Sequence, residues 1–304
     1  MRLYVSFMLK PLQPGDAIAI IATARKIAAP EIETAIACFT NWELKVVLGQ
    51  TIGASYNQFA GDDALRLQDL QEMLDNPDIK AIICARGGYG TTRIIDQVDF
   101  TLFRDNPKWL VGFSDVTALH SHIHNLHLES VHAIMPVLFS KPGTETSIES
   151  LRRILFGEEI NYTAPAHVLN RTGMGQGQLV GGNLSMLHTL TGTRSDIDTA
   201  GKILFLEDLD EYLYHIDRMM VHLDRSGKLA NLAGLIVGDM SDMHDNMIPF
   251  GKTALEIINE HTGKYNYPVS YGFPVGHEPL NLALVCGREA ILEVDDDGVR
   301  LRYL

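Results

Sequence analysis

Apolar runs and segments of helical spacing alternate along the first half of the chain. The run Asp16–Ala24 is apolar at nearly every position, which is typical of a strand buried on both faces of a sheet. The segment Asp62–Leu74 instead repeats its apolar residues at helical spacing, so that they share one broad face. Further strands are expected at Leu44–Leu48, Ile79–Ala85 and Trp109–Phe113, and further helices at Glu31–Phe39 and about 115–126. This order predicts an α/β fold whose N-terminal sheet is mostly parallel and carries helices on both faces.

The pattern changes after about residue 138. Residues 141–146 have the composition of a loop, and residues 161–182 are rich in glycine and show no helical period. We therefore expect an α/β domain over residues 1–140, a linker region over 141–180 and a mixed, β-rich α/β domain over 181–304. The expected helices of this C-terminal domain are 183–190 and 212–223, and its expected strands are 203–206, 234–237, 268–271, 283–286, 290–294 and 299–303.

Composition and charge narrow the class of protein. Of the 304 residues, 46% are hydrophobic and 21% are charged, which is ordinary for a globular protein. The formal net charge is -13, and no run rich in Lys and Arg offsets it. Nucleic acids and anionic membranes bind clustered cations, so neither is expected as a partner. A small anionic substrate is not excluded, because its binding depends on local charge.

Cysteine usage and the N-terminal residues bear on the compartment. Cys38, Cys84 and Cys286 are widely separated and form no CxxC pair, so neither a zinc ribbon nor a disulfide framework is expected. The start MRLYVSFMLK is too short and too soon interrupted for a signal peptide, and no apolar run approaches the roughly 20 residues that span a bilayer. We expect a soluble cytoplasmic protein.

The segment WLVGFSDVTALH places Ser114 between a buried strand and a helix. A serine there projects from a sharp turn at the carboxyl edge of the sheet, and the N-terminus of the following helix stabilises negative charge. The backbone N–H of Asp115 is then a natural oxyanion donor. The nucleophile-elbow pattern G-x-S-x-G is only half present, since Val116 stands in place of the second glycine. On this motif alone, a serine that caps the helix is the simpler interpretation.

Two other segments supply the partners that a nucleophilic serine needs. FPVGHEP places His277 in a Gly/Pro-rich turn, and KILFLEDLDE ends an apolar run at Glu207. Each alone is more often structural. Together with Ser114 they provide nucleophile, acid and base, in that order along the chain, which is the composition of an acyl-transfer triad.

Two rival sites are visible in the sequence. His120 and His124 have the i,i+4 spacing of a helical metal pair, but the glutamate of HExxH is missing and a polar helix surface explains them equally well. Cys84, near RGGYG, lies inside an apolar strand, where cysteines are inert packing residues. We therefore expect neither a metal site nor a cysteine nucleophile.

Five ordered motifs resemble one known family. RGGYGTTRIID, VGFSDVTALH, LVGGNLSMLHTLTGT, LFLEDLDEYLYHIDRMM and FPVGHEP are similar, in this order and spacing, to the LD-carboxypeptidases, a serine peptidase group that includes microcin immunity peptidases. The resemblance runs from about Gly15 to the C-terminus. One departure is visible: ATARKI follows the first strand, where family members often carry a Pro-Ser or Ser-Pro pair.

The resemblance implies a function and a set of site residues. Ser114 matches the family nucleophile, Glu207 the acid and His277 the base, with the serine on an N-terminal α/β domain and the other two on a C-terminal domain. The oxyanion hole implied is the N–H of Asp115 with one from the pair Gly87 and Gly88, of which Gly87 has the better spacing.

The resemblance further implies that the chain removes the terminal D-Ala from murein tetrapeptide during cell-wall recycling in the bacterial cytoplasm. It also implies that the chain needs no metal or organic cofactor and forms a homodimer, as family members commonly do. We expect Arg86 to bind the free carboxylate of the substrate, although a solvated or structural arginine is an equal alternative. Two other functions stay open. One is cleavage of an acylated aminonucleotide antibiotic, as by microcin immunity peptidases, and the other is non-enzymatic binding of small peptides in a cleft.

Overall fold

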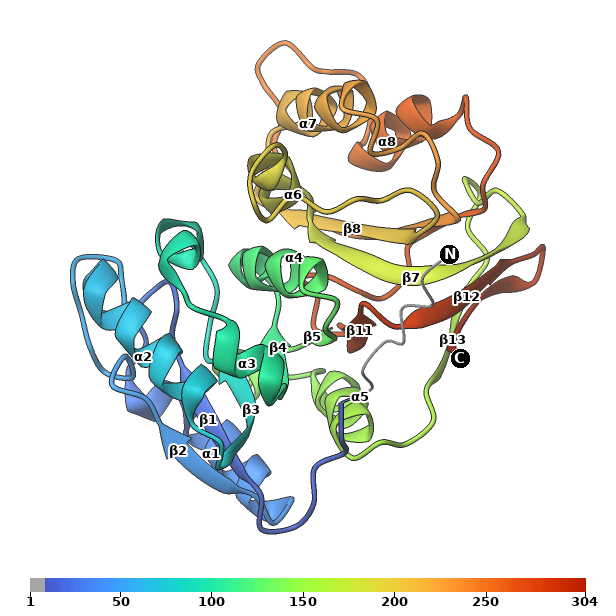
Figure 1. Cartoon of the computed structure of the whole chain (residues 1–304). Helices are drawn as coiled ribbons and strands as arrows, with labels where there is room; N and C mark the ends of the chain where they lie inside the picture. Colours follow the sequence, from blue (N-terminus) through green and yellow to red (C-terminus); the bar gives the residue numbers. More distant parts are fainter. Residues whose placement is uncertain (1–8) are drawn as a thin grey trace. The chain divides into compact units, whose positions relative to one another are not determined.

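The computed structural model describes residues 9–304, which form two compact units (Figure 1). The first contains the described chain up to Glu159 together with Leu282–Val285, and the second contains Ile160–Asn281 and Cys286–Leu304. The boundary between Glu159 and Ile160 lies inside the segment 141–180 that was expected as a linker. That segment holds helix α5 (Glu145–Leu155), strand β6 (Asn161–Pro165) and most of β7 (Gly173–Asn183).

The first unit is built on a six-stranded sheet in the order β11-β5-β4-β3-β1-β2. The pairings of β1 with β2, β1 with β3, β3 with β4 and β4 with β5 are all parallel, which confirms the predicted sheet. The central strand β4 is buried at every residue, whereas β2 is largely exposed, as befits an edge strand. The strands are β1 (Ala17–Ile21), β2 (Lys45–Leu48), β3 (Ile79–Cys84), β4 (Trp109–Gly112), β5 (Ser130–His132) and β11 (Leu284–Cys286).

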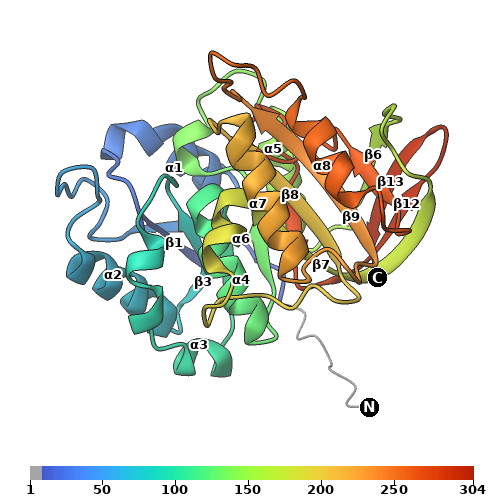
Figure 2. The ribbon, with the colours of Figure 1, turned by 90° about the horizontal axis from the view of Figure 1, so that it is seen from above.

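Helices cover both faces of this sheet. The connection from β1 to β2 runs towards one edge and the later connections run towards the other, so right-handed crossovers place α1 opposite α2, α3 and α4. Figure 2 shows α1 and α2 on either side of β1 and β3. The helices are α1 (Glu33–Asn41), α2 (Asp63–Asp75), α3 (Thr101–Asp105), α4 (Thr117–Asn125) and α5, with short 3-10 turns at Ala29–Ile32, Thr91–Arg93, Ile95–Gln97, Ser114–Val116 and Pro136–Leu138.

Strand β11 differs from the expectation for residues 283–286, which placed them in the second domain. It lies beside β5 at the edge of the first sheet, and the backbone N–H of Ala283 donates to the hydroxyl of Ser150 on α5, at 2.9 Å. A short, fully buried apolar strand fits either sheet by its pattern, so only its pairing partner decides where it belongs.

The second unit contains a seven-stranded mixed sheet in the order β10-β9-β8-β7-β12-β13-β6. The strands from β7 to β10 are parallel, and those from β7 through β12 and β13 to β6 are antiparallel. This mixed unit confirms the predicted C-terminal fold class. The remaining strands are β8 (Ile203–Leu209), β9 (Gly234–Ser241), β10 (Val269–Tyr271), β12 (Glu289–Val294) and β13 (Gly298–Tyr303).

Three helices cover the parallel half of this sheet: α6 (Leu184–Leu190), α7 (Leu213–Arg225) and α8 (Ala254–Thr262). Figures 1 and 2 show them on the same side of β8. Their apolar residues join those of the strands in one core, which includes Leu206, Ile216 and Ile257. Helix α8 was not predicted from the sequence, although Thr253 and Glu256 form a capping box at its start.

The glycine-rich strand β7 was also missed. A Cβ atom at Gly177 would lie 2.3 Å from the carbonyl oxygen of Gly201, and one at Gly181 would lie 2.0 Å from that of Phe205. These glycines therefore allow close packing of backbone on backbone inside a strand, rather than marking a loop.

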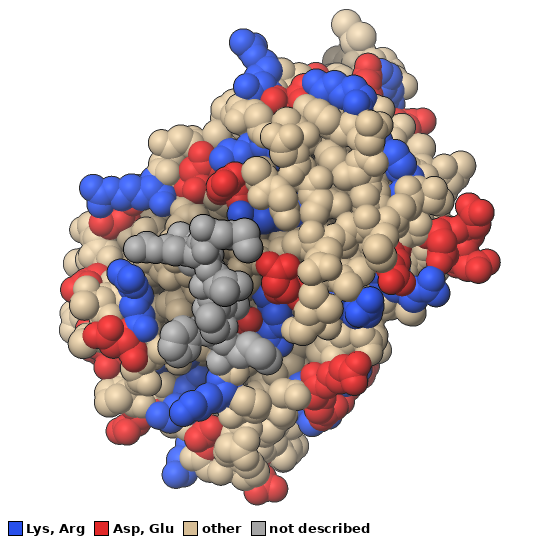
Figure 3. All heavy atoms as spheres, turned by 45° about the vertical axis from the view of Figure 1, so that its right-hand side comes forward, with Lys and Arg blue, Asp and Glu red and all other residues tan. Residues whose placement is uncertain are grey.

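No helix in the described range 9–304 is both long and apolar enough to cross a membrane. On the face drawn in Figure 3, basic side chains stand singly or in small groups beside acidic ones.

Candidate active site

The residues singled out in the sequence fall into two groups. Ser114, Asp115, Gly87, Gly88 and Arg86 belong to the first unit, at the carboxyl ends of β4 and β3. Glu207 and His277 belong to the second unit, Glu207 within the last residues of β8 and His277 in the turn after β10. Both groups thus lie at the strand ends where α/β sheets bind ligands.

Ser114 adopts a backbone conformation that is rare for a residue other than glycine. Its φ is +64°, in the left-handed region, and it lies two residues after the end of β4, where it starts the turn that leads into α4. Such a conformation costs of order 1–3 kcal/mol and persists only where the surrounding structure enforces it. The sharp turn gives Ser114 the geometry of a nucleophile elbow.

The half-missing elbow pattern has a steric explanation. A Cβ atom on Gly112 would lie 2.9 Å from one methyl carbon of Val116 and 3.1 Å from Cβ of Cys84. Val116, which occupies the place of the second glycine, therefore packs into the space that Gly112 leaves open. One glycine suffices for the close approach of helix and strand in this chain.

The RGGYG loop lies directly against the serine. A Cβ atom on Gly87 would come within 3.0 Å of Cβ and 3.2 Å of Oγ of Ser114. Gly88, with a φ of +108°, continues the loop in a conformation that favours glycine. The structure therefore brings together Ser114 and the backbone of the glycine pair. The backbone N–H of Asp115, in the first turn after β4, belongs to the set that has no acceptor within its own helix.

The side chain of Asp115 has a role that the sequence analysis missed. Its carboxylate accepts hydrogen bonds from the backbone N–H of Thr91 at 3.0 Å and of Gly90 at 3.2 Å, so it ties the serine turn to the end of the RGGYG loop. Burial raises the pKa of this carboxyl, and the bonds from Thr91 and Gly90 oppose the rise. An acidic residue directly after the serine was visible in the sequence, but only the backbone N–H of Asp115 was considered there, and its carboxylate was not.

Arg66 of α2 holds the same loop from the other side. It is fully buried, and one guanidinium nitrogen donates to the carbonyl oxygens of Thr23 at 2.6 Å and Gly90 at 2.9 Å. The guanidinium also pairs with Asp63. A buried arginine inside a helix gives no sequence signal of such a contact, because its partners are backbone carbonyls on other elements.

Arg86 lies at the start of the loop, where its guanidinium already has contacts. One nitrogen donates to the carbonyl oxygen of Lys26 at 3.1 Å and lies 4.0 Å from a carboxylate oxygen of Glu31. Burial, and then the nearby charge of Arg25, lower the pKa of Arg86.

In the second unit, His277 and Glu207 form a short hydrogen bond. Nδ1 of His277 lies 2.6 Å from a carboxylate oxygen of Glu207, which is completely buried. Burial of the imidazole disfavours its charged form, but the bond to Glu207 and its negative charge outweigh burial, so that the pKa of His277 is raised. The bond to Glu207 at Nδ1 therefore fixes the orientation of the ring.

Two more carboxyl groups act on this histidine. Asp208 and Asp239 both favour the charged imidazole, beside the larger effect of Glu207. Burial, and then the charge of Glu207, raise the pKa of Asp208 to about 7. Burial, and then the charge of Glu278, raise the pKa of Asp239 to about 7. Of these three carboxyl groups, only Glu207 was predicted from the sequence as a site residue.

The turn that carries His277 is fixed by its neighbours. A Cβ atom on Gly276 would lie 2.9 Å from Cβ of Asp239 and 3.2 Å from Cβ of Glu207. The backbone N–H of Gly276 donates to Oδ1 of Asn281 at 3.2 Å. Asp239 and Glu207 therefore pack directly against the residue before His277.

The histidines of α4 are engaged in packing. Both ring nitrogens of His120 have partners, at 2.8 Å from the hydroxyl oxygen of Ser130 and 2.9 Å from the carbonyl oxygen of Gly112, and burial lowers its pKa to about 4. His122 stacks on Phe100. Within residues 9–304, no three His, Cys, Asp or Glu side chains are grouped to hold a metal ion.

Cys84 is unsuited to nucleophilic attack. It is fully buried in β3, and burial, with a smaller effect of Asp115, raises its pKa to about 12. The thiolate is the nucleophilic form, and it is scarce at neutral pH for such a thiol.

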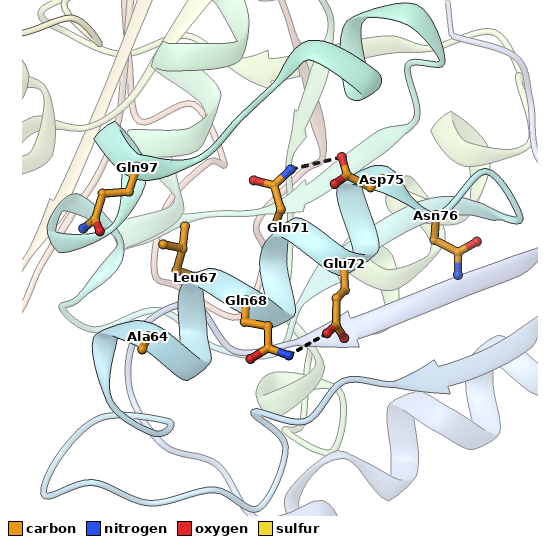
Figure 4. Close-up of a pocket in the computed structure, with 8 residues that line it drawn as sticks. All are labelled: Ala64, Leu67, Gln68, Gln71, Glu72, Asp75, Asn76 and Gln97. Atoms are coloured by element: carbon orange, nitrogen blue, oxygen red, sulfur yellow. Dashed lines mark hydrogen bonds between the residues drawn. The ribbon is translucent and has the colours of Figure 1, made fainter.

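A surface groove along α2 offers no comparable chemistry. Its lining side chains pair with one another, Gln68 with Glu72 at 2.8 Å and Gln71 with Asp75 at 3.0 Å (Figure 4). Such i,i+4 pairs are typical of a solvated helix face.

Comparisons with known proteins cover most of the chain. Residues 18–133 match the model of the LD-carboxypeptidase N-terminal domain, and residues 176–292 match that of the C-terminal domain. The chain is 35% identical over 299 residues to a probable murein peptide carboxypeptidase of Bacillus subtilis, covering 95% of this chain and 92% of the relative. It is 31% identical over 304 residues to the murein tetrapeptide carboxypeptidase of Pseudomonas aeruginosa, covering 96% of each.

A solved structure has the same fold. The muramoyltetrapeptide carboxypeptidase of Oxalobacter formigenes superposes with a TM-score of 0.86 at 27% identity, covering 94% of this chain and 98% of that one. Both family models match in the expected order, and these relatives align over nearly their whole length. The chain therefore belongs to the LD-carboxypeptidase family of serine peptidases.

Proposed function

We propose that the chain is an LD-carboxypeptidase that hydrolyses the amide bond before the terminal D-Ala of murein tetrapeptide, in cell-wall recycling. The observation that carries the proposal is the left-handed backbone of Ser114 at the end of β4, with Gly87 packed against its side chain. The relatives named for murein peptides supply the substrate class.

In this proposal, Ser114, His277 and Glu207 act as a triad. The hydroxyl oxygen of Ser114 attacks the carbonyl carbon before D-Ala while Nε2 of His277 takes the hydroxyl proton. Glu207, bonded to Nδ1 at 2.6 Å, holds the tautomer and stabilises the imidazolium. The resulting oxyanion binds the backbone N–H of Asp115 and one from the glycine pair, Gly87 or Gly88.

The remaining steps return the enzyme to its starting state. The C–N bond breaks, D-Ala leaves with the proton from His277, and the remaining peptide stays as an ester on Ser114. Water then attacks this ester with His277 as base, which releases the shortened peptide and restores the hydroxyl. No step requires a cofactor.

The test is D-Ala release from murein tetrapeptide by the wild type and by Ser114→Ala, with EDTA present. We expect release by the wild type and a loss of roughly 10⁶-fold in kcat for the variant, which is typical when a triad nucleophile is removed. Activity that persists in folded Ser114→Ala would exclude the serine mechanism.

The same assay separates the rival functions. Folded wild type that releases no D-Ala but cleaves an acylated aminonucleotide would assign the microcin-immunity-like activity instead. If the wild type binds the peptide but turns over neither substrate, the remaining interpretation is a non-enzymatic protein that binds small peptides in a cleft. Arg86 remains a proposed binder of the substrate carboxylate. A loss in kcat/KM of less than twofold in Arg86→Ala would exclude this role.

A cytoplasmic location and a homodimer complete the proposal. Both rest on the family resemblance and on the sequence. Light scattering of the purified chain checks the second point, for which a mass of one 33.7 kDa chain would be the contrary result.

A further inference from the structure

The carboxyl ends of three neighbouring strands meet at the serine edge of the first sheet. The strands β4, β3 and β1 are adjacent in that order. β4 leads into Ser114, β3 into the glycine pair, and β1 into the segment that carries Arg25. Neighbouring strands lie about 4.8 Å apart, so β1 ends roughly 10 Å from β4. A substrate bound over Ser114 is therefore within reach of a long side chain from the β1 end.

Arg25 packs directly on the glycine pair. Its backbone N–H donates to the carbonyl oxygen of Gly87 at 3.4 Å. A Cβ atom on Gly88 would lie 3.0 Å from Cβ and 3.3 Å from Cδ of Arg25, so the aliphatic part of the arginine runs along this glycine. Since Gly87 in turn lies against Ser114, Arg25 is separated from the serine by the width of one loop.

The guanidinium of Arg25 is also available. The side chain is exposed, and no ion pair within the described chain, residues 9–304, includes it. Arg86 differs, because its guanidinium is anchored to the backbone of Lys26 and lies near Glu31. The net charge of the chain is -13, so acidic partners are abundant, yet this guanidinium forms no ion pair within residues 9–304. It can therefore bind an anionic group of a ligand.

We propose that Arg25 binds the free carboxylate of the leaving D-residue and thereby restricts the enzyme to chain ends. This inference rests on the proposed function and names Arg25, ahead of Arg86, as the specificity residue. In a C-terminal residue the carboxylate is two bonds from the nitrogen of the scissile amide, so it stays close to the attacked carbonyl. A guanidinium presents two parallel N–H groups that match a carboxylate.

The experiment compares two substrates, murein tetrapeptide with a free C-terminal carboxylate and the same peptide as its C-terminal amide. The variant is Arg25→Gln, which keeps the aliphatic packing on Gly88 and removes the charge. Lys26→Gln is the matched control, because it removes a positive charge from the neighbouring position and keeps the carbonyl that Arg86 uses. Arg86→Gln is the third variant. The readout is kcat/KM on each substrate.

We expect the wild type to prefer the acid, and Arg25→Gln to lose roughly 10- to 100-fold on the acid with little change on the amide. Lys26→Gln should keep the preference. A loss that is equal on both substrates would show a structural role and overturn the proposal. A preference that survives in Arg25→Gln and collapses in Arg86→Gln would overturn it in favour of Arg86. Wild type inactive on both substrates would overturn the proposed function and this inference with it, whereas the other contrary results leave the proposed function standing.

Discussion

The serine edge of the first unit and the surroundings of His277 in the second unit are built in different ways. At the serine edge of the first unit, the arrangement depends mostly on the backbone. Ser114 has a left-handed φ, Gly87 packs against its side chain, and N–H groups lie at the start of a helical turn. Around His277 in the second unit, the arrangement depends on charged side chains. Glu207, Asp208 and Asp239 all act on His277.

In the proposed mechanism, the two regions would serve different parts of an acyl transfer. Fixed backbone dipoles suit a group that must be positioned and an oxyanion that forms briefly, because they need no reorganisation. A cluster of carboxyls suits a base that gains a proton and becomes a cation during each turnover. Substitutions that disturb geometry should therefore act at the first edge, and substitutions that disturb charge should act at the second.

The largest effect after loss of the serine is expected for Glu207→Gln. The amide keeps the shape of the carboxylate but cannot stabilise the imidazolium, so kcat should fall by about 10⁴-fold. Glu211→Gln is the matched control, because Glu211 makes the same 2.6 Å bond to Nδ1 of His215 elsewhere in that unit. Equal rates for the two variants would remove Glu207 from the mechanism.

Gly87→Ala tests the geometric edge. The new methyl group would lie 3.0 Å from Cβ and 3.2 Å from Oγ of Ser114, so the loop must shift away from the serine. Displacing an oxyanion donor in this way should lower kcat by about 10²–10³-fold. The pKa of His277 should stay unchanged, since no charge is altered. A shifted pH profile would contradict the separation of the two edges.

Asp239→Asn tests the charged edge, with the smallest effect. His277 must be neutral to accept the serine proton, and its raised pKa moves the acidic limb of the kcat/KM profile to higher pH. Removing one of the carboxyls that favour the imidazolium lowers that pKa, so the limb should move to lower pH with less than a tenfold change at the optimum. Asp242→Asn, an exposed carboxylate on the same segment, is the control. A limb that moves to higher pH would contradict the account.

Much of the fold could be predicted from the sequence because it is locally encoded. The apolar runs at β1, β3 and β4 and the helical spacing of α2 are each a property of one segment, and the structure has them within a few residues of their expected bounds. Ser114 and Asp115 were also singled out from one local pattern, a serine between a strand and a helix, whereas Gly87 and Gly88 were singled out through the resemblance to the family.

The contacts that support the site were not predictable in the same way. The carboxylate of Asp115 bonds to N–H groups 24 and 25 residues earlier, and Arg66 bonds to the carbonyl of Gly90. Each depends on a loop whose place is set by neighbouring strands. The packing of Arg25 on Gly88 is of the same kind, since β1 and β3 are neighbours only in the folded sheet.

The sequence by itself determined the α/β class, the strand–turn–helix at Ser114 and the order of the five family motifs, because these depend on local period and on residue identity. Tertiary structure alone decided that β11 joins the first sheet, that the glycines of β7 form a strand, and that Asp208 and Asp239 gather around His277. The physical reason is that pairing, close packing and the pKa of a group depend on which distant segments meet, and a local pattern carries no record of its partner.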